Sequence, residues 1–147
     1  MNPAIARIVR TRLFRVTCVS AVAAATYPAF LLAFVYAHFF ASGLPGGRHG
    51  PADAYRHALA SAIVAYTLHP RGVDWVTQLM ERDGRGSPAR AMDAHNNRLG
   101  ARIGASAESI TALRQSIAAA VSNGAIAAAS PDQITWLAPD AWQDRLY

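Results

Sequence analysis

Apolar and polar positions divide the chain into two parts of different character. Residues 16–42 form an apolar run without a single Asp, Glu, Lys or Arg. Such a run predicts a membrane-spanning helix, which needs about 20 mostly apolar residues. In residues 51–147, apolar residues instead recur three and four positions apart, between Pro, Ser and Gly residues, which predicts a series of amphipathic helices.

The periodicity of the second part predicts helices with defined ends. We expect them over about 51–68, 73–82, 88–103, 107–122 and 131–137, with a last turn or two from Pro139. Ser87 and Ser106 are the expected N-caps of the third and fourth of these helices. The Ala-rich segment 125–130 fits either a helix extension or a loop. Because no segment alternates convincingly with period two, the predicted fold class is all-α, with an N-terminal transmembrane helix followed by a compact bundle of about four to six helices.

Charge is distributed unevenly around the apolar run. Residues 1–15 carry four of the 14 basic residues and no acid, whereas all nine acidic residues follow residue 42. The positive-inside rule therefore predicts a cytoplasmic N-terminus and a domain in the periplasm or outside the cell, at a bacterial inner membrane. Most of the net charge of +5 lies in the N-terminal arm, so we expect no nucleic-acid partner.

These patterns divide the chain into four segments. They are a basic cytoplasmic arm (1–15), a transmembrane anchor (16–42), a Gly-rich linker (43–50) and a helical extracytoplasmic domain (51–147). The lipid bilayer is the expected partner of the anchor. A cleaved signal peptide is the alternative, but the run is long for that role and no convincing small-x-small cleavage site follows it. Cys18 is the only cysteine and precedes the domain, which excludes a disulfide or a cysteine-based site within the domain.

Two of the predicted helices carry a polar stripe that ends in small residues. The stripes are Asp53, Arg56 and His57 on the first helix, and Asp93, Asn96 and Asn97 on the second, the latter followed by Gly100 and Gly104. Mid-helix Asn and Gly are unfavourable by propensity, by roughly 0.5–1 kcal/mol each against Ala. Their presence favours two helices that approach closely and share a buried polar cluster.

Asp53 and His57 are four residues apart, so their side chains can touch on a helix. One interpretation is a general acid–base pair in which Asp53 orients His57, with Glu81 or Asp93 as the second acid. The other is a helix-start acid paired with a core histidine. In the first interpretation, the residues that position a substrate or stabilise developing charge are Arg56, Asn96 and Asn97.

Other candidate side chains have ordinary structural explanations. A carboxylate-rich cluster around His57 would suit a divalent cation. Because the chain lacks the paired-His spacing of known metal motifs, we predict no metal ligands. The sequence specifies no cofactor. His49 lies in the linker and His95 on the far side of its helix from Asp93, which makes both poor ligands. Ser61 lacks the Gly-x-Ser-x-Gly context of a nucleophile. The chain has three tryptophans, Trp75, Trp136 and Trp142. We expect them in the core or at an interface.

The two stripes resemble the paired signatures of an uncharacterised bacterial family, a domain of unknown function. The matching segments are DAYRHALASA at 53–62 and AMDAHNNRLGARIG at 91–104. Members show Asp-x-x-Arg-His, then an acidic position on a second helix, then Met-Asp-x-x-Asn-Asn-x-x-Gly. Glu81 falls at the acidic position, where the family often has His-Glu, and Met80 replaces that His here. The resemblance covers roughly residues 50–105 and implies a helical domain of secreted, envelope or toxin-like contexts, with no established reaction.

Two hypotheses of different class follow. The first is a membrane-anchored hydrolase that acts on cell-envelope material, either peptidoglycan or a lipid, through the His and carboxylate cluster. The second is a non-enzymatic envelope scaffold, immunity or interaction protein that binds a protein partner and whose polar cluster is structural. Access distinguishes them, because catalysis requires that His57 and a carboxylate reach a substrate, whereas a structural network does not.

Overall fold

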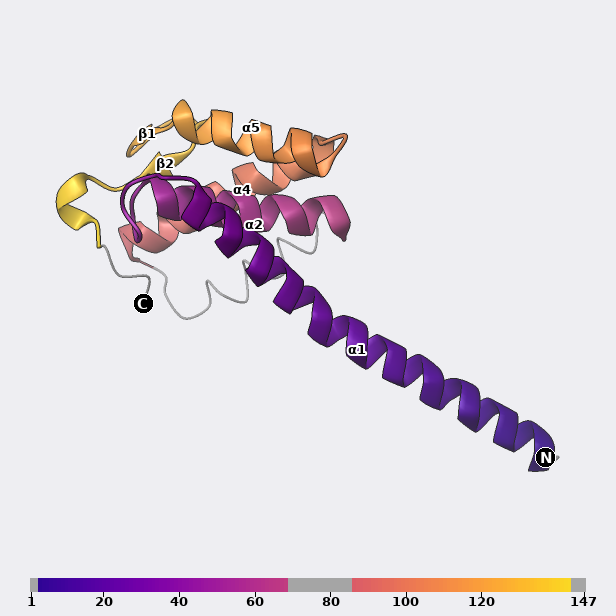
Figure 1. The fold of residues 1–147 in the computed structure, drawn as a ribbon. Coiled ribbons are helices and arrows are strands. Elements are labelled where there is room, and N and C mark those ends of the chain that lie inside the picture. The colour runs from indigo at the N-terminus through magenta and orange to yellow at the C-terminus, as the bar shows by residue number, and fades with distance from the viewer. Residues whose placement is uncertain (1–2, 69–85, 144–147) are drawn as a thin grey trace. The chain divides into compact units, whose positions relative to one another are not determined.

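The computed structural model describes residues 3–68 and 86–143 (Figure 1). The chain divides into two compact units, Met1–Phe34 and Val35–Tyr147. The helix predicted over 73–82, together with Glu81 and Trp75, lies outside the described residues. Four α-helices account for most of the described residues, which confirms the predicted all-α class.

Helix α1 spans Pro3–Ala41 and continues through Pro28. Its segment Phe14–Ala41 is long and apolar enough to cross a membrane, with a mean hydropathy of 1.9. An interior Pro is tolerated in membrane helices. Large apolar side chains of the first unit are exposed to the surroundings, and they include Phe14, Val16, Val19, Val22, Phe30 and Leu32. Large apolar side chains exposed in this number are unfavourable in water and suit a lipid environment.

The second unit includes the end of α1 and the segment predicted as a linker. Val35 and Phe39 belong to the apolar run, yet both are buried. After α1, the Ala52 N–H donates to the Pro45 carbonyl at 3.0 Å. Arg48 and Gln143 exchange two backbone hydrogen bonds of 2.8 and 3.2 Å. The folded domain therefore begins before residue 43, and the Gly-rich segment is hydrogen-bonded into it.

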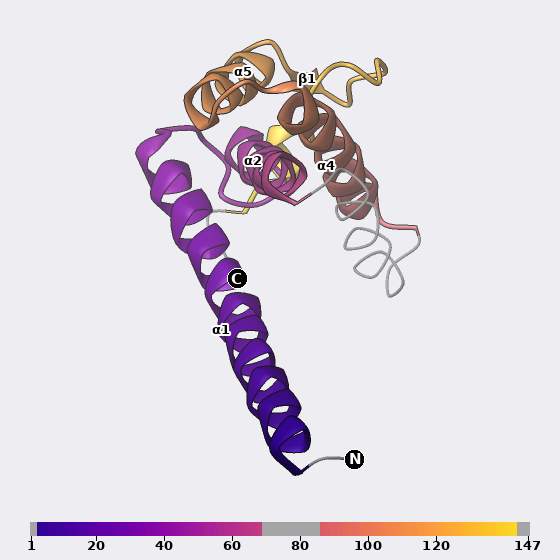
Figure 2. The ribbon, with the colours of Figure 1, turned by 90° about the vertical axis from the view of Figure 1, so that its right-hand side faces the viewer.

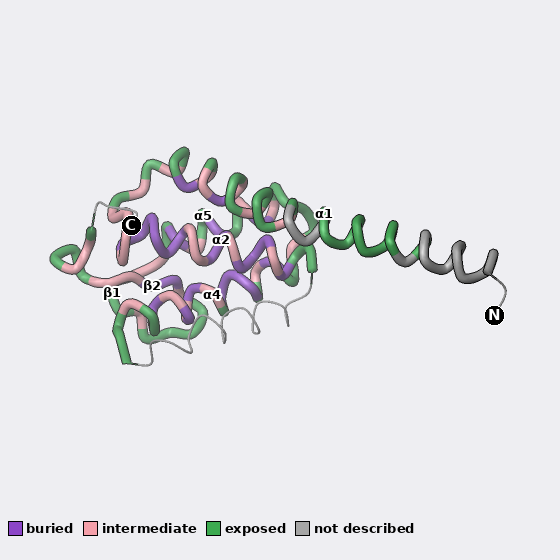
Figure 3. Tube along the Cα trace, turned by 90° about the horizontal axis from the view of Figure 1, so that it is seen from below, coloured by how far each residue is buried: buried purple, intermediate pink, exposed green. Residues whose placement is uncertain are grey.

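In the described part of the second unit, three helices pack around the core after the end of α1: α2 (Pro51–Thr67), α4 (Pro88–Ser106) and α5 (Ile110–Ser122). Helix α2 packs mainly on α4 and also on α5 (Figure 2). Buried positions run along α2 and along one side of α4 (Figure 3). The largest fully buried side chains are Leu59, Ile63, Leu113, Ile117, Ile134 and Asn96.

Helices α2 and α4 touch through their backbones at two glycines. A Cβ at Gly100 would collide with the carbonyl group of Ala58, and one at Gly104 with that of Ala62. The close helix contact predicted from these glycines is confirmed. Contacting positions advance together along the two helices, so α2 and α4 run parallel. This register brings the start of each helix, where the acids lie, to the same end of the pair.

The helix predicted over 131–137 is wrong. Thr135–Trp136 is instead a short strand, β2, which pairs in parallel with β1 at Ala125–Ile126. The Ala-rich segment 125–130 therefore contains a strand and a loop. Ile, Thr and Trp at 134–136 favour extended backbone. The 3₁₀ turn η1 at Pro139–Ala141 matches the last turn predicted from Pro139.

The predicted cap of α5 also requires correction. Helix α4 continues to Ser106, so Ser106 ends one helix and does not begin the next. Ser109 is the N-cap of α5, and its Oγ accepts a hydrogen bond of 3.1 Å from the Ala112 N–H. Both serines precede an apolar periodic segment, and only the length of α4 decides between them.

Candidate functional site

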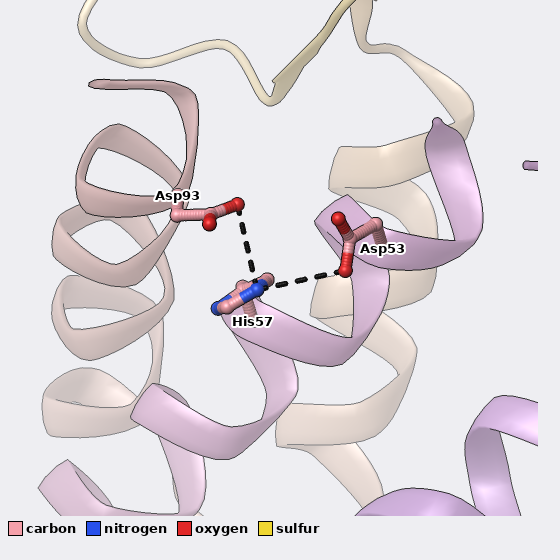
Figure 4. Close-up of side chains that lie close together, drawn as sticks. All are labelled: Asp53, His57 and Asp93. Atoms are coloured by element: carbon pink, nitrogen blue, oxygen red, sulfur yellow. Dashed lines mark ion pairs between the residues drawn. The ribbon is translucent and has the colours of Figure 1, made fainter. Parts of the chain in front are cut away.

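Asp53 and His57 of α2 and Asp93 of α4 converge at one end of the helix pair (Figure 4). His57 Nε2 lies 3.5 Å from Asp53 Oδ1 and 3.4 Å from Asp93 Oδ1. Asp53 and His57 are adjacent because they are one helical turn apart. Asp93 joins them because the glycine contacts hold α4 directly against α2. The structure thus brings together three of the four residues predicted to be catalytic.

Asp53 is the fixed anion of this cluster. Its side chain is only 3% exposed. Oδ1 accepts a hydrogen bond from Arg56 Nη2, and Oδ2 accepts one of 2.7 Å from the His49 N–H. A carboxylate in the first turn of α2 also interacts favourably with the positive end of the helix dipole. Asp53 is therefore held in one position and is almost removed from solvent.

His49 belongs to the cluster, although its place in the linker made it a poor candidate. It has a φ of +65°, a left-handed conformation that is uncommon outside Gly. Its N–H donates to Asp53, and its ring Nδ1 lies 3.9 Å from Asp53 Oδ2. Nδ1 is buried and has no hydrogen-bond partner among the described residues. Its separation of four residues from Asp53, two residues before Pro51, was the available sequence signal.

Arg56 places its guanidinium between the acids and the imidazole. Nη2 contacts Asp53 Oδ1 and lies 3.3 Å from His57 Nε2. Since a guanidinium only donates hydrogen bonds, this contact is a hydrogen bond only when His57 Nε2 carries no proton. The ligand atoms of Asp53, His57 and Asp93 all lie within 4.8 Å of one another, so these residues could hold a divalent cation. Such an ion would have to displace Arg56, which already supplies positive charge there.

Asp93 is the perturbed acid of the cluster. Burial raises its pKa above the ordinary value, and the negative charge of Asp53 adds to this effect, while His57 and Arg56 oppose it. Asp93 Oδ1 is buried without a hydrogen-bond partner among the described residues. The side chains of His57 and Asp93 remain 21% and 28% exposed. The titratable pair therefore reaches solvent, whereas the anion behind it does not.

The model of a family described as a domain of unknown function, DUF6973, matches residues 12–128. The chain belongs to the DUF6973 family. The resemblance to an uncharacterised domain family is thereby confirmed. Comparison with curated proteins and with solved structures returned no match. The match begins within helix α1 and ends after β1, so the family domain includes the Asp53, His57 and Asp93 cluster.

The two asparagines of the DUF6973 domain form tertiary hydrogen bonds. Asn96 is fully buried, its Nδ2 donates to the Thr135 carbonyl at 2.8 Å, and its Oδ1 accepts from the Thr135 N–H at 3.0 Å. Asn97 Oδ1 accepts a bond of 2.9 Å from Ser61 Oγ, which links α4 to α2. Asn96 thus has neither exposed surface nor a free amide atom for a substrate. Asn97 is partly exposed and lies one turn after Asp93.

The remaining sequence candidates of the DUF6973 domain lie apart from the cluster or outside the described residues. His95 Nε2 lies 2.7 Å from the Gln133 carbonyl, on the far side of α4 from Asp93. Glu81, predicted as an alternative second acid, lies outside the described residues. Asp93 is therefore the described acid that meets His57 from another helix.

Proposed function

We propose that this chain is a membrane-anchored hydrolase that acts outside the cytoplasm on cell-envelope material, with His57 and Asp93 as its acid–base pair. One observation carries the proposal: a carboxyl group with a raised pKa lies 3.4 Å from an imidazole, and both side chains are partly exposed. Ionisable groups with perturbed pKa values at an accessible position are typical of catalytic sites.

The roles follow from the protonation states. The raised pKa lets Asp93 keep its proton over a wider pH range than an ordinary carboxyl, so Asp93 can protonate a leaving oxygen. His57 can take the proton of an attacking water as the scissile bond breaks. Asp53 orients this site through Arg56, and the Arg56 charge stabilises negative charge that develops on the substrate. Asn97, beside Asp93, is the remaining candidate for positioning the substrate.

The N-terminal helix supports the location. A helix of sufficient length and hydropathy precedes the domain, and the basic arm before it predicts a cytoplasmic N-terminus at a bacterial inner membrane. A domain tethered in this way would face two abundant substrates, phospholipid and peptidoglycan. Both contain ester, amide or glycosidic bonds whose hydrolysis uses a proton donor and a proton acceptor.

Hydrolysis by the full chain tests the proposal. The protein in detergent micelles is incubated with purified peptidoglycan sacculi and, separately, with phospholipid vesicles, and released muropeptides or fatty acids are identified by mass spectrometry. We expect His57→Gln and Asp93→Asn each to lower the rate by at least about 100-fold, the usual contribution of an acid or base. Asp132→Asn is the matched control, because Asp132 is 81% exposed and its partner among the described residues is Arg102. Release of product by folded His57→Gln at the wild-type rate would exclude the proposed roles.

A second candidate function is supported by the hydrogen bonds inside the cluster. Arg56 satisfies Asp53, and Asn96 and Asn97 are bonded to their own domain. A scaffold, immunity or interaction protein would use the same network only to hold α2 and α4 together. This function predicts that a folded His57→Gln variant keeps its full biological effect in cells and that neither sacculi nor vesicles are hydrolysed by the wild type.

A further inference from the structure

A second candidate site lies on the other side of α2, away from the Asp53 and His57 cluster. A pocket of about 220 Å³ is lined by Tyr55 of α2 and by Thr111, Arg114, Gln115 and Ala118 of α5. Tyr55 lies two residues from both Asp53 and His57, so it projects from the opposite face of the helix. This pocket is therefore separate from the proposed hydrolytic site.

The pocket contains a cation that the described part of the chain does not neutralise. Arg114 Nε is buried without a hydrogen-bond partner, and no described residue forms an ion pair with this guanidinium. The lining contains no Asp or Glu among the described residues. Arg114 as a whole is half-buried, and its buried Nε donor is unfavourable without an acceptor unless a ligand binds to it.

The other lining groups complement the same anion. The Tyr55 hydroxyl has no hydrogen-bond partner among the described residues, and it lies close enough to Arg114 for the guanidinium charge to act on it. Thr111 and Gln115 add a hydroxyl and an amide, and each can donate a hydrogen bond. Thr111 also lies in the first turn of α5, where the helix dipole favours negative charge.

We propose that the Tyr55–Arg114 pocket binds a phosphate group. Its volume is below the roughly 300–1,000 Å³ of sites for whole small molecules, which favours a single anionic group. Arg is the side chain best suited to phosphate, because its planar fork forms two parallel hydrogen bonds. The phosphate could belong to a lipid headgroup or to a soluble phosphate.

The position of the pocket favours the lipid as the source. Arg114 lies close enough to His38 for the two groups to interact electrostatically, and His38 is in the last turn of α1. The candidate membrane span ends at Ala41, three residues after His38, where the chain would leave the apolar core. Lipid phosphates lie at this level, and basic side chains there bind anionic headgroups.

Binding to the full chain in detergent micelles tests the proposal. The probes are phosphatidic acid, diacylglycerol with the same acyl chains, and inorganic phosphate, each titrated and detected by native mass spectrometry and microscale thermophoresis. We expect phosphatidic acid to bind at least about tenfold more tightly than diacylglycerol, and Arg114→Gln to remove this preference. Arg90→Gln is the matched control, because Arg90 is exposed on α4 and the substitution removes the same charge.

Each outcome either tests the phosphate site or identifies the source of the phosphate. Inorganic phosphate that binds as tightly as phosphatidic acid, with the same loss in Arg114→Gln, supports the site with a soluble ligand. Equal binding of phosphatidic acid and diacylglycerol overturns it, as does an equal effect of Arg114→Gln and Arg90→Gln. If Arg114→Gln does not fold, Tyr55→Phe replaces it, since this variant removes only the hydroxyl and should weaken phosphatidic acid binding severalfold. Unchanged binding by folded Tyr55→Phe would then also contradict the site.

Discussion

Asn96 binds both the N–H and the carbonyl of Thr135, so one fully buried side chain fixes strand β2 against helix α4. Removing this amide leaves two backbone groups of Thr135 without a partner. Each buried backbone group left without a hydrogen-bond partner costs about 1–3 kcal/mol. We therefore expect Asn96→Ala to lower the free energy of unfolding by about 2–6 kcal/mol, measured by urea denaturation. Asn123→Ala is the control, because the Asn123 bond to Ala119 is exposed, and it should change stability by less than about 1 kcal/mol. Equal effects of the two substitutions would contradict a fixing role for Asn96.

The glycine contacts between α2 and α4 predict that Gly→Ala substitutions lower stability instead of raising it. A Gly→Ala change inside a helix ordinarily stabilises by up to about 1 kcal/mol. At Gly100 and Gly104 the added methyl group would meet the backbone of Ala58 and Ala62, which cannot rotate away. We expect each substitution to destabilise the domain by about 2 kcal/mol or more, as overpacking does. Thermal melts of both variants measure this. A rise in melting temperature for either would show that the helices are not in contact there.

Two Arg–Asp ion pairs in the domain differ mainly in burial. The Asp53 side chain is 3% exposed in its pair with Arg56, whereas Asp132 is 81% exposed in its pair with Arg102. Loss of Asp53 also removes the acceptor of the His49 N–H. Breaking a buried pair typically costs about 3–5 kcal/mol, and an exposed pair contributes about 0–1 kcal/mol. Chemical denaturation should therefore show that Asp53→Ala is severely destabilised and Asp132→Ala nearly neutral. Similar losses in both would mean that Asp53 is not held as described.

The raised pKa of Asp93 makes stability depend on pH. Burial favours the protonated form in the folded state, so the folded protein binds more protons than the unfolded protein between the two pKa values. Stability from this group is therefore highest below the unfolded Asp value, near pH 4, and falls as the pH rises through the raised pKa of Asp93. We expect Asp93→Asn to remove this fall. Urea denaturation of both proteins from pH 4 to pH 7.5 measures the difference. Parallel curves for wild type and variant would place the titration elsewhere.

Sequence patterns predicted the elements whose signals are local. Helices α2, α4 and α5 follow from apolar periodicity, and the starts of α2 and α4 also from Pro51 and Pro88, because helical hydrogen bonds join residues four apart. Asp53 and His57 could be paired for the same reason. The exchange of helix for strand at Thr135–Trp136 could not be predicted, since its decisive partners are Asn96 and Ala125, which are distant in sequence.

Spacing along the sequence did not by itself identify which residues form the Asp53, His57 and Asp93 cluster. Asp93 was a candidate from its stripe, but only the parallel register of α2 and α4 places it beside His57 rather than beside another turn. His49 was set aside because a linker residue gives no periodic signal, and its left-handed backbone conformation is what directs its N–H to Asp53. Asn96 and Asn97 looked equivalent in sequence, yet adjacent helix positions differ by about 100° and so meet different elements.

The sequence by itself determined the apolar helix, the all-α class and the two polar helix faces, because each of these depends on residues within a few turns of one another. Only the tertiary structure places Asp93 beside His57 and directs the Asn96 amide to the backbone of Thr135. It also brings Arg114 and Tyr55 into one pocket. These relationships depend on the relative position of whole helices. That position results from the sum of many packing contacts, such as those at Gly100 and Gly104, and no short segment specifies it alone.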